Sequence, residues 1–229
     1  VVVGFSKKLY REMLRYGLPL VIVGLAGITN EMLDKVLLRF LLPGSQEENI
    51  AEVGIYGAWY KLSILMTMFI QAFRYAAEPF FFSESSNRDA KATFASVLTY
   101  FVGIGLLVFL GVMLYLDLVK HFIGDRYHNM GGEELVPVLL LGNLFLGIHY
   151  NFSIWYKLQD KTKLGAIVAI GGAIVTIIGL LLLVPAWGIF GAAWATFICY
   201  SSMAVGSYFL GQKYYPVNYP LRKVAGLML

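Results

Sequence analysis

Long apolar runs separated by short polar segments dominate the sequence. Each run approaches or exceeds the roughly 20 residues that an α-helix needs to cross a bilayer. The runs predict six membrane-spanning helices, at about residues 16–42, 53–82, 93–116, 135–158, 164–184 and 189–210. Residues 1–15 precede them as a basic lead, and residues 211–229 form an interfacial tail and the start of a truncated helix. The expected fold class is therefore all-α, a polytopic membrane helix bundle.

The first predicted helix carries polar residues in the middle of an apolar run. They are four charged residues and a neighbouring amide: Asn30, Glu31, Asp34, Lys35 and Arg39. A charge near the middle of a bilayer costs about 2.5–3.5 kcal/mol on insertion scales. With about 3.6 residues per turn, these side chains fall on one half of the helix. We therefore expect them to face a protein interior or water rather than lipid.

The second predicted helix carries a continuous polar stripe. Seven residues recur at steps of three or four: Tyr56, Tyr60, Ser63, Thr67, Gln71, Arg74 and Glu78. This spacing places them within an arc of about 80° on one face. Because the turn between the two helices is short, the helices are antiparallel neighbours, and Lys61 is expected at the depth of Asp34. We therefore expect an ion pair between Asp34 and Lys61.

Together the two helices predict a hydrophilic cavity that reaches deep into the membrane. Its cations would attract an anionic group: Lys35, Arg39, Lys61 and Arg74. Its acidic and amide residues would bind a coupling cation or a proton: Asn30, Glu31, Asp34 and Glu78. The alternative is that these charges only join the two helices as buried pairs. The stripe is far longer than one ion pair needs, which favours the cavity.

Other polar and small residues in the later spans are open to two interpretations. Asn143, His149 and Asn151 would either hydrogen-bond sugar hydroxyls or join neighbouring helices. Small residues recur at four-residue steps typical of close helix packing in lipid: Gly165, Ala169 and Ala173, Gly191 and Ala195, Ser202 and Gly206. His121 and His128 lie near Asp125 without a known metal-ligand spacing, so we expect a solvated loop and no metal site.

Composition excludes several classes of protein. A mean hydropathy of +0.70, with 59% hydrophobic and 14% charged residues, excludes an ordinary soluble domain. The basic residues lie between apolar runs rather than in one patch, so the net charge of +4 does not indicate nucleic-acid binding. The single Cys199 cannot build a disulfide framework. No P-loop, nucleophile elbow, HExxH or GxGxxG motif occurs, so we expect no enzyme and no cofactor, and an energy source that is either ionic, Na⁺ or H⁺, or supplied by another protein.

The distribution of Lys and Arg predicts the orientation. They concentrate in the lead, in the loops after the second and fourth helices, and in the tail, whereas the other loops hold only Lys120 and Arg126. The positive-inside rule then places both ends in the cytoplasm. Because the sequence does not begin with Met and both ends read as parts of further apolar segments, we interpret it as an internal fragment of a longer protein.

Short motifs resemble a known family of transporters. They stand at residues 15–20 (RYGLPL), 29–30 (TN), 34–35 (DK), 53–56 (VGIY), 60–61 (YK) and 188–196 (GIFGAAWAT). In this order and spacing they resemble the polysaccharide-biosynthesis lipid flippases of the multidrug/oligosaccharidyl-lipid/polysaccharide exporter (MOP) superfamily. The resemblance implies a two-lobed bundle of twelve or fourteen helices, in which this chain is most of the second lobe and lacks its N-terminal partner lobe.

The resemblance also implies a substrate and a mechanism. The substrate class is an undecaprenyl-diphosphate-linked oligosaccharide, a repeat unit of O-antigen, capsule or exopolysaccharide, flipped across the bacterial inner membrane by ion-coupled alternating access. Lys35, Arg39, Lys61 and Arg74 suit the diphosphate. The remaining stripe residues suited to the glycan are Tyr56, Tyr60 and Gln71.

Three alternatives remain at this point. A multidrug exporter or cation antiporter of the same superfamily would use acidic cavity residues to bind cationic drugs, but cations outnumber anions here. A membrane polymerase or ligase acting on the same lipid would need a large external loop, and the longest such loop covers only residues 117–134. A purely structural subunit would not explain the polar stripe.

Overall fold

The structure, a computed structural model, describes residues 6–128 and 130–228, apart from the side chains of residues 29–31 and 125. Within these residues six long helices follow one another: α1 (Lys7–Leu41), α2 (Gln46–Glu84), α3 (Ala90–Leu114), α5 (Leu135–Leu158), α6 (Thr162–Trp187) and α7 (Ile189–Tyr214). Short helices complete the chain: α4 (Leu116–Val119), η1 (Lys120–Ile123), η2 (Asp125–Tyr127) and α8 (Leu221–Met228). The predicted all-α bundle is confirmed.

Five of the described helices are long and apolar enough to cross a membrane: α2, α3, α5, α6 and α7. Helix α1 has 35 residues, which corresponds to about 50 Å of helix. Its outward face exposes large apolar side chains along most of its length, at Leu18, Val21, Leu25, Met32 and Val36. Such a face requires lipid or another protein surface beside it.

The turn between α1 and α2 is short because side chains cap it. Ser45 and Glu48 form a reciprocal capping box at the start of α2. The Asn49 amide donates to the backbone carbonyls of Arg39 and Leu42, at the end of α1. These bonds start α2 at Gln46, earlier than the predicted start at about residue 53.

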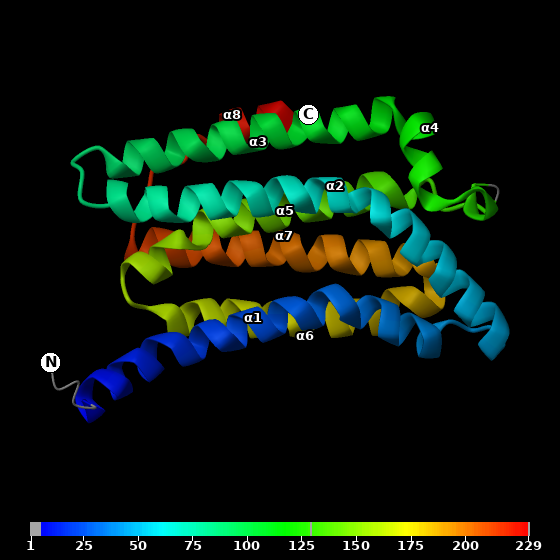
Figure 1. Cartoon of the computed structure of the whole chain (residues 1–229), viewed down its shortest axis with the longest axis horizontal. Coiled ribbons are helices and arrows are strands. Elements are labelled where there is room, and N and C mark those ends of the chain that lie inside the picture. Colours follow the sequence, from blue (N-terminus) through cyan, green and yellow to red (C-terminus); the bar gives the residue numbers. More distant parts are fainter. Residues whose placement is uncertain (1–5, 129, 229) are drawn as a thin grey trace, which may run out of the picture.

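The helices form layers around α5 and α7 (Figure 1). Helices α1 and α6 pack together on one side of this pair, and α2, α3 and α8 lie on the other. Helix α5 is buried along most of its length and contributes Leu139, Leu140 and Leu144 to the main hydrophobic core. From their shared turn, α1 and α2 diverge, since α1 follows α6 whereas α2 follows α5 and α3.

Small residues determine how closely α6 and α7 approach. Gly188 joins them with a φ of +57°, a backbone conformation that favours glycine. A Cβ at Gly191 would stand 2.2 Å from the carbonyl oxygen of Leu183, and one at Gly179 would stand 3.0 Å from the Ala195 Cβ. The two helices therefore pack through their backbones, as expected for small residues in lipid.

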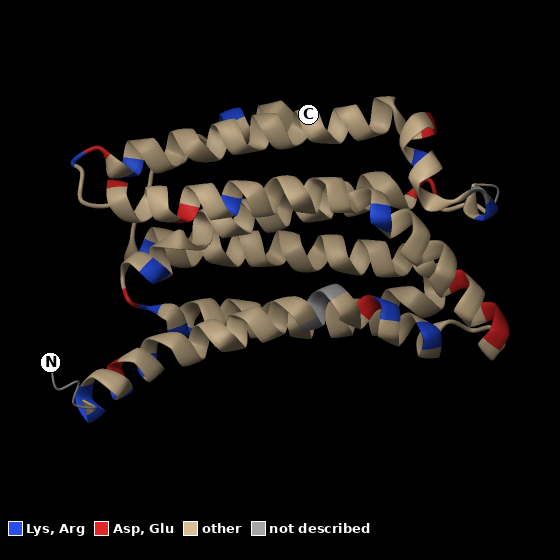
Figure 2. Cartoon of the chain, viewed as in Figure 1, with Lys and Arg blue, Asp and Glu red and all other residues tan. Residues whose placement is uncertain are grey.

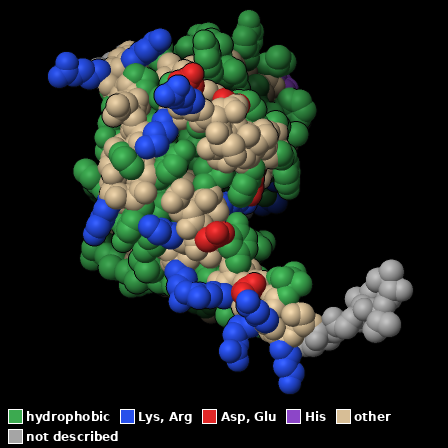
Figure 3. All heavy atoms as spheres, turned by 90° about the vertical axis from the view of Figure 1, so that its left-hand side faces the viewer, with side chains coloured by type: hydrophobic (Ala, Val, Ile, Leu, Met, Phe, Trp, Pro, Cys, Tyr) green, Lys and Arg blue, Asp and Glu red, His purple; other side chains and the backbone are tan. Residues whose placement is uncertain are grey.

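The two ends of the bundle carry opposite net charges (Figure 2), and the basic end faces the viewer in Figure 3. Lys and Arg gather at the start of α1 and at the α2–α3, α5–α6 and α7–α8 connections, whereas acidic residues predominate near the α1–α2 turn and in the segment before α5. Antiparallel helices bring these segments to their respective ends. The structure thus collects the predicted basic segments on one end.

We predict that Gly191→Ala destabilises the protein by about 1–3 kcal/mol, because its Cβ collides with backbone that cannot move aside as a side chain can. Gly206→Ala on the same helix is the control, since nothing lies within 4 Å of its Cβ position. It should be neutral or stabilising by up to about 1 kcal/mol. Denaturant unfolding of the full-length protein in detergent measures both. Equal stability of the two variants would contradict the backbone contact.

Candidate functional site

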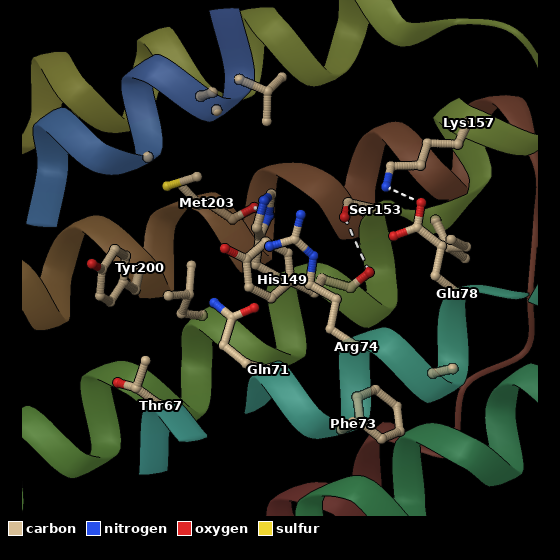
Figure 4. Close-up of a pocket in the computed structure, with 18 of the residues that line it drawn as sticks. Thr67, Gln71, Phe73, Arg74, Glu78, His149, Ser153, Lys157, Tyr200 and Met203 are labelled. Atoms are coloured by element: carbon tan, nitrogen blue, oxygen red, sulfur yellow. Dashed lines mark hydrogen bonds and ion pairs between the residues drawn. The ribbon is translucent and has the colours of Figure 1, made fainter. Parts of the chain in front are cut away.

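A cavity of about 380 Å³ lies between the diverging helices α1 and α2 (Figure 4). Helices α5 and α7 form its floor, with one residue from α6. Its polar and aromatic lining comes from Tyr60, Thr67, Gln71, Arg74 and Glu78 of α2, Asn143, His149, Tyr150, Ser153, Tyr156 and Lys157 of α5, and Tyr200 of α7. A volume of this size is within the range of small-molecule sites in proteins.

Arg74 is the central cation of the cavity. Its guanidinium lies 4.6 Å from the ring centroid of Tyr150 and, in Figure 4, reaches from α2 toward His149 on α5. The side chain is half-buried. Among the described residues, no carboxylate forms an ion pair with Arg74. Its charge therefore lies against an aromatic face at the border of the cavity.

Glu78, one turn further along α2, is paired. Its carboxylate accepts a hydrogen bond from the Lys157 ammonium of α5, and both side chains are partly buried. This ion pair joins α2 to α5 at one end of the cavity (Figure 4). The pair is neutral overall, so it leaves Arg74 as the uncompensated charge among the described lining residues.

Two polar residues of α5 both line the cavity and join helices. The Asn143 amide donates to the Ser63 carbonyl of α2. His149 Nδ1 lies 2.8 Å from the Ser207 hydroxyl and 3.3 Å from the Met203 carbonyl, both on α7. Asn151 donates back to Gly147 within α5 and is not a lining residue. The two interpretations of this group are thus not exclusive, since the interhelical bonds fix side chains that also border the cavity.

The wall contributed by α1 has a different chemistry. Its lining residues are Leu20, Val23, Gly24, Gly27 and Ile28, none of which has a polar side chain. A Cβ placed at Gly24 or Gly27 would meet nothing within 4 Å, so both positions border open space. Among the described residues, the polar lining side chains all come from α2, α5 and α7.

Nearer the α1–α2 turn, Asp34 is buried with an exposed fraction of 1%. Its Oδ2 accepts a 2.6 Å hydrogen bond from the hydroxyl of the fully buried Tyr56. Its Oδ1 accepts from the backbone and the ammonium of Lys35, at 2.7 and 3.2 Å. That ammonium also lies 3.5 Å from the ring centroid of Tyr60. We call the cluster of Asp34, Lys35, Tyr56 and Tyr60 the α1–α2 knot.

The expected ion pair of Asp34 with Lys61 was wrong. Because α2 begins at Gln46 rather than at about residue 53, the residue opposite Asp34 is Tyr56. Lys61 is exposed, and so is Arg39, whose guanidinium lies near its own neighbour Phe40. Neither lines the cavity.

The remaining predicted site residues divide into three groups. Tyr60, Gln71, Arg74 and Glu78 line the cavity. Tyr56, Asp34 and Lys35 belong to the knot, and of its members Tyr60 alone also borders the cavity. The side chains of Asn30 and Glu31 lie outside the described residues.

Sequence reasoning identified Asn143 and His149 on the floor of the cavity but missed the rest of that floor. Tyr150, Ser153, Tyr200 and Met203 line it, but they stand among apolar residues without a stripe of their own. Only the pairing of α5 with α7 and α2 brings them together. Within the described residues, no group of three His, Cys, Asp or Glu side chains has a geometry that could hold a metal ion.

The fold and the cavity define a class: a polytopic membrane bundle with a polar site between two of its helices. The chain is similar in fold to a multidrug resistance MATE family transporter of the MOP superfamily, solved in an outward-facing conformation, with a TM-score of 0.64 and 18% identity. The similarity covers 93% of this chain and 48% of that chain, so this chain spans about half the length of the transporter. No protein-family model and no curated protein sequence matches the chain.

The similarity shows that the fold of this chain resembles about half of that transporter. That solved structure belongs to the superfamily that the sequence motifs resemble, and it is described as a multidrug resistance transporter.

We predict that Tyr56→Phe destabilises the protein by about 1.5–3 kcal/mol, because it removes a hydrogen bond from a buried carboxylate. Tyr75→Phe on the same helix is the control, since Tyr75 is 79% exposed. It should change stability by less than about 0.5 kcal/mol. Denaturant unfolding in detergent measures both, and a Tyr56→Phe protein as stable as the control would exclude an energetic role for the knot.

Proposed function

We propose that this chain is half of a transporter that flips an undecaprenyl-diphosphate-linked oligosaccharide across the bacterial inner membrane by ion-coupled alternating access. The observation that carries the proposal is Arg74, a cation without a carboxylate partner among the described residues, in a cavity lined by aromatic, hydroxyl and amide side chains. The fold of half of a MOP transporter is consistent with it.

The chemistry of the cavity suits a phosphate. A guanidinium presents a planar fork of N–H donors that binds phosphate oxygens in pairs, and it stays charged at any physiological pH. In a confined site the attraction between Arg74 and a phosphate is stronger than in bulk water, because the effective dielectric constant is lower. A diphosphate would also neutralise Arg74, which has no carboxylate partner among the described residues.

The remaining lining suits sugars. Glycan hydroxyls need hydrogen-bonding partners, and Gln71, Asn143 and Tyr200 border the cavity with amide and hydroxyl groups. Tyr60 and Tyr150 provide ring faces next to them, although each ring already lies beside a cation, Lys35 and Arg74 respectively. Lys35 and Tyr56 would act indirectly in this proposal, by fixing the knot that positions Tyr60.

Arg39 and Lys61 would contribute to binding only in the complete transporter. Both are exposed on this chain, and a second lobe facing α1 and α2 would enclose them in a shared vestibule. The exposed apolar side chains of α1 are compatible with such a lobe or with membrane lipid. The partner lobe, the lipid-linked oligosaccharide and lipid are thus the proposed partners, with no nucleic acid.

Ion coupling would use the acidic residues next to the cavity. A proton or Na⁺ at Asp34 would compete with Lys35 and Tyr56 for its oxygens and so loosen the contact between α1 and α2. Glu78 would respond in the same way through Lys157. Asn30 and Glu31 belong to this part of the proposal by their position in the sequence.

The proposed orientation places both ends of the chain on the cytoplasmic side. The collection of Lys and Arg at one end of the bundle supports it, since cytoplasmic segments of membrane proteins carry an excess of these residues.

A multidrug exporter is the second candidate, because the solved structure of similar fold is described as a multidrug resistance transporter. A cationic drug would need a free carboxylate in the cavity. Glu78 is available only if Lys157 leaves it, since the two form an ion pair.

We predict that Arg74→Gln lowers the rate of flipping by about 10- to 100-fold, the effect expected for loss of a charged hydrogen bond to phosphate. Arg74→Lys should retain an intermediate rate, because it keeps the charge without the planar fork. The measurement follows a fluorescent lipid-linked oligosaccharide in proteoliposomes containing the full-length protein, under imposed Na⁺ or proton gradients.

The control is Arg126→Gln, which removes an exposed positive charge from a loop outside the cavity and should leave the rate unchanged. A normal rate for Arg74→Gln would refute the proposed anion site. Transport of a cationic dye by a protein that does not move the lipid would support the multidrug exporter instead.

A further inference from the structure

The two walls of the cavity differ in polarity along its whole length. The α2, α5 and α7 wall carries Arg74, Gln71, His149 and the Glu78–Lys157 pair. The α1 wall carries only aliphatic side chains and two glycines. Figure 4 shows the labelled polar residues across the cavity from α1. A uniform hydrophilic solute would leave the α1 wall without a partner.

We infer that the cavity binds an amphiphile in one orientation, with its anionic headgroup at Arg74 and the first part of its hydrocarbon chain against α1 at Leu20, Val23, Gly24 and Gly27. This inference rests on the proposed function and adds to it where the lipid part of the substrate lies. The aliphatic α1 wall can receive hydrocarbon without leaving any polar side chain unsatisfied.

The glycines make this wall accessible to a chain. At Gly24 and Gly27 the α1 backbone faces open space, so a hydrocarbon chain can lie directly against the helix. They are three positions apart in the sequence and thus share one face of α1. Ile28, next to Gly27, both lines the cavity and is 58% exposed at the bundle surface. A hydrocarbon chain that follows Gly24, Gly27 and Ile28 therefore runs from the cavity to the outside of the bundle.

The divergence of α1 and α2 provides an exit from the cavity for the hydrocarbon chain of the ligand. Helix α1 packs along α6, and Figure 1 shows it separating from α2 beyond their turn. The rest of the hydrocarbon chain would leave between these helices past Ile28, next to which α1 also exposes Leu25. These aliphatic side chains are compatible with hydrocarbon.

The test compares two probes on the full-length protein. One is the polyprenyl-diphosphate-linked oligosaccharide, and the other is a water-soluble glycosyl diphosphate without the chain. Gly27→Leu fills the space along α1, so it should weaken binding of the long-chain probe by at least about tenfold while changing affinity for the soluble probe less than about twofold. Gly171→Leu on α6 is the control, because nothing lies within 4 Å of its Cβ position and it is outside the cavity.

The outcomes separate this inference from the proposed function. Suppose that Arg74→Gln weakens binding of both probes, but that Gly27→Leu weakens binding of neither, or of both equally. The anion site is then supported, and the proposed position of the hydrocarbon chain is wrong. If Arg74→Gln weakens neither probe, the proposed function fails.

A second measurement does not depend on a substitution. A photoreactive group near the diphosphate end of the chain should label the peptide of residues 20–28, identified by mass spectrometry. Labelling confined to other helices would overturn the inference.

Discussion

A buried carboxylate fixes the relation between α1 and α2. Asp34 is a charge in a helix that lies within a membrane bundle, and such a charge is tolerated only with partners. Tyr56 from α2 and Lys35 from α1 supply them. The contact lies close to the Asn49 bonds that close the turn, so both constraints act at one end of the helices. The other ends of α1 and α2 are free to follow different neighbours.

The cavity follows from this arrangement. Because α1 packs on α6 and α2 packs on α5, the helices separate beyond the knot, and α5 and α7 form the floor between them. The bonds of Asn143 to α2 and of His149 to α7 keep that floor together without filling the space above it. A polar cavity in the membrane is thus maintained by hydrogen bonds at its border, as expected where lipid cannot satisfy polar groups.

The sequence predicts those features that depend on one helix at a time. Apolar runs of sufficient length give the bundle, and the stripe on α2 places Thr67, Gln71, Arg74 and Glu78 on one face. Which residues of two neighbouring helices lie opposite each other depends also on where each helix begins. A start of α2 near residue 53 puts Lys61 opposite Asp34. The Ser45–Glu48 capping box, which is visible in the sequence, starts the helix at Gln46 instead. On the floor only Asn143 and His149 stand out as polar residues in an apolar span, whereas Tyr150, Ser153, Tyr200 and Met203 come together only through tertiary packing.

Charge balance distinguishes the two substrate classes. Among the described lining residues, Glu78 and Lys157 neutralise each other and Arg74 is left over. An anion entering the cavity compensates Arg74 without breaking any interaction. A cation would be repelled by Arg74 and would have to displace Lys157 from Glu78, which leaves a second buried charge without a partner. The charge balance of the described lining residues therefore favours a phosphate over an ammonium group.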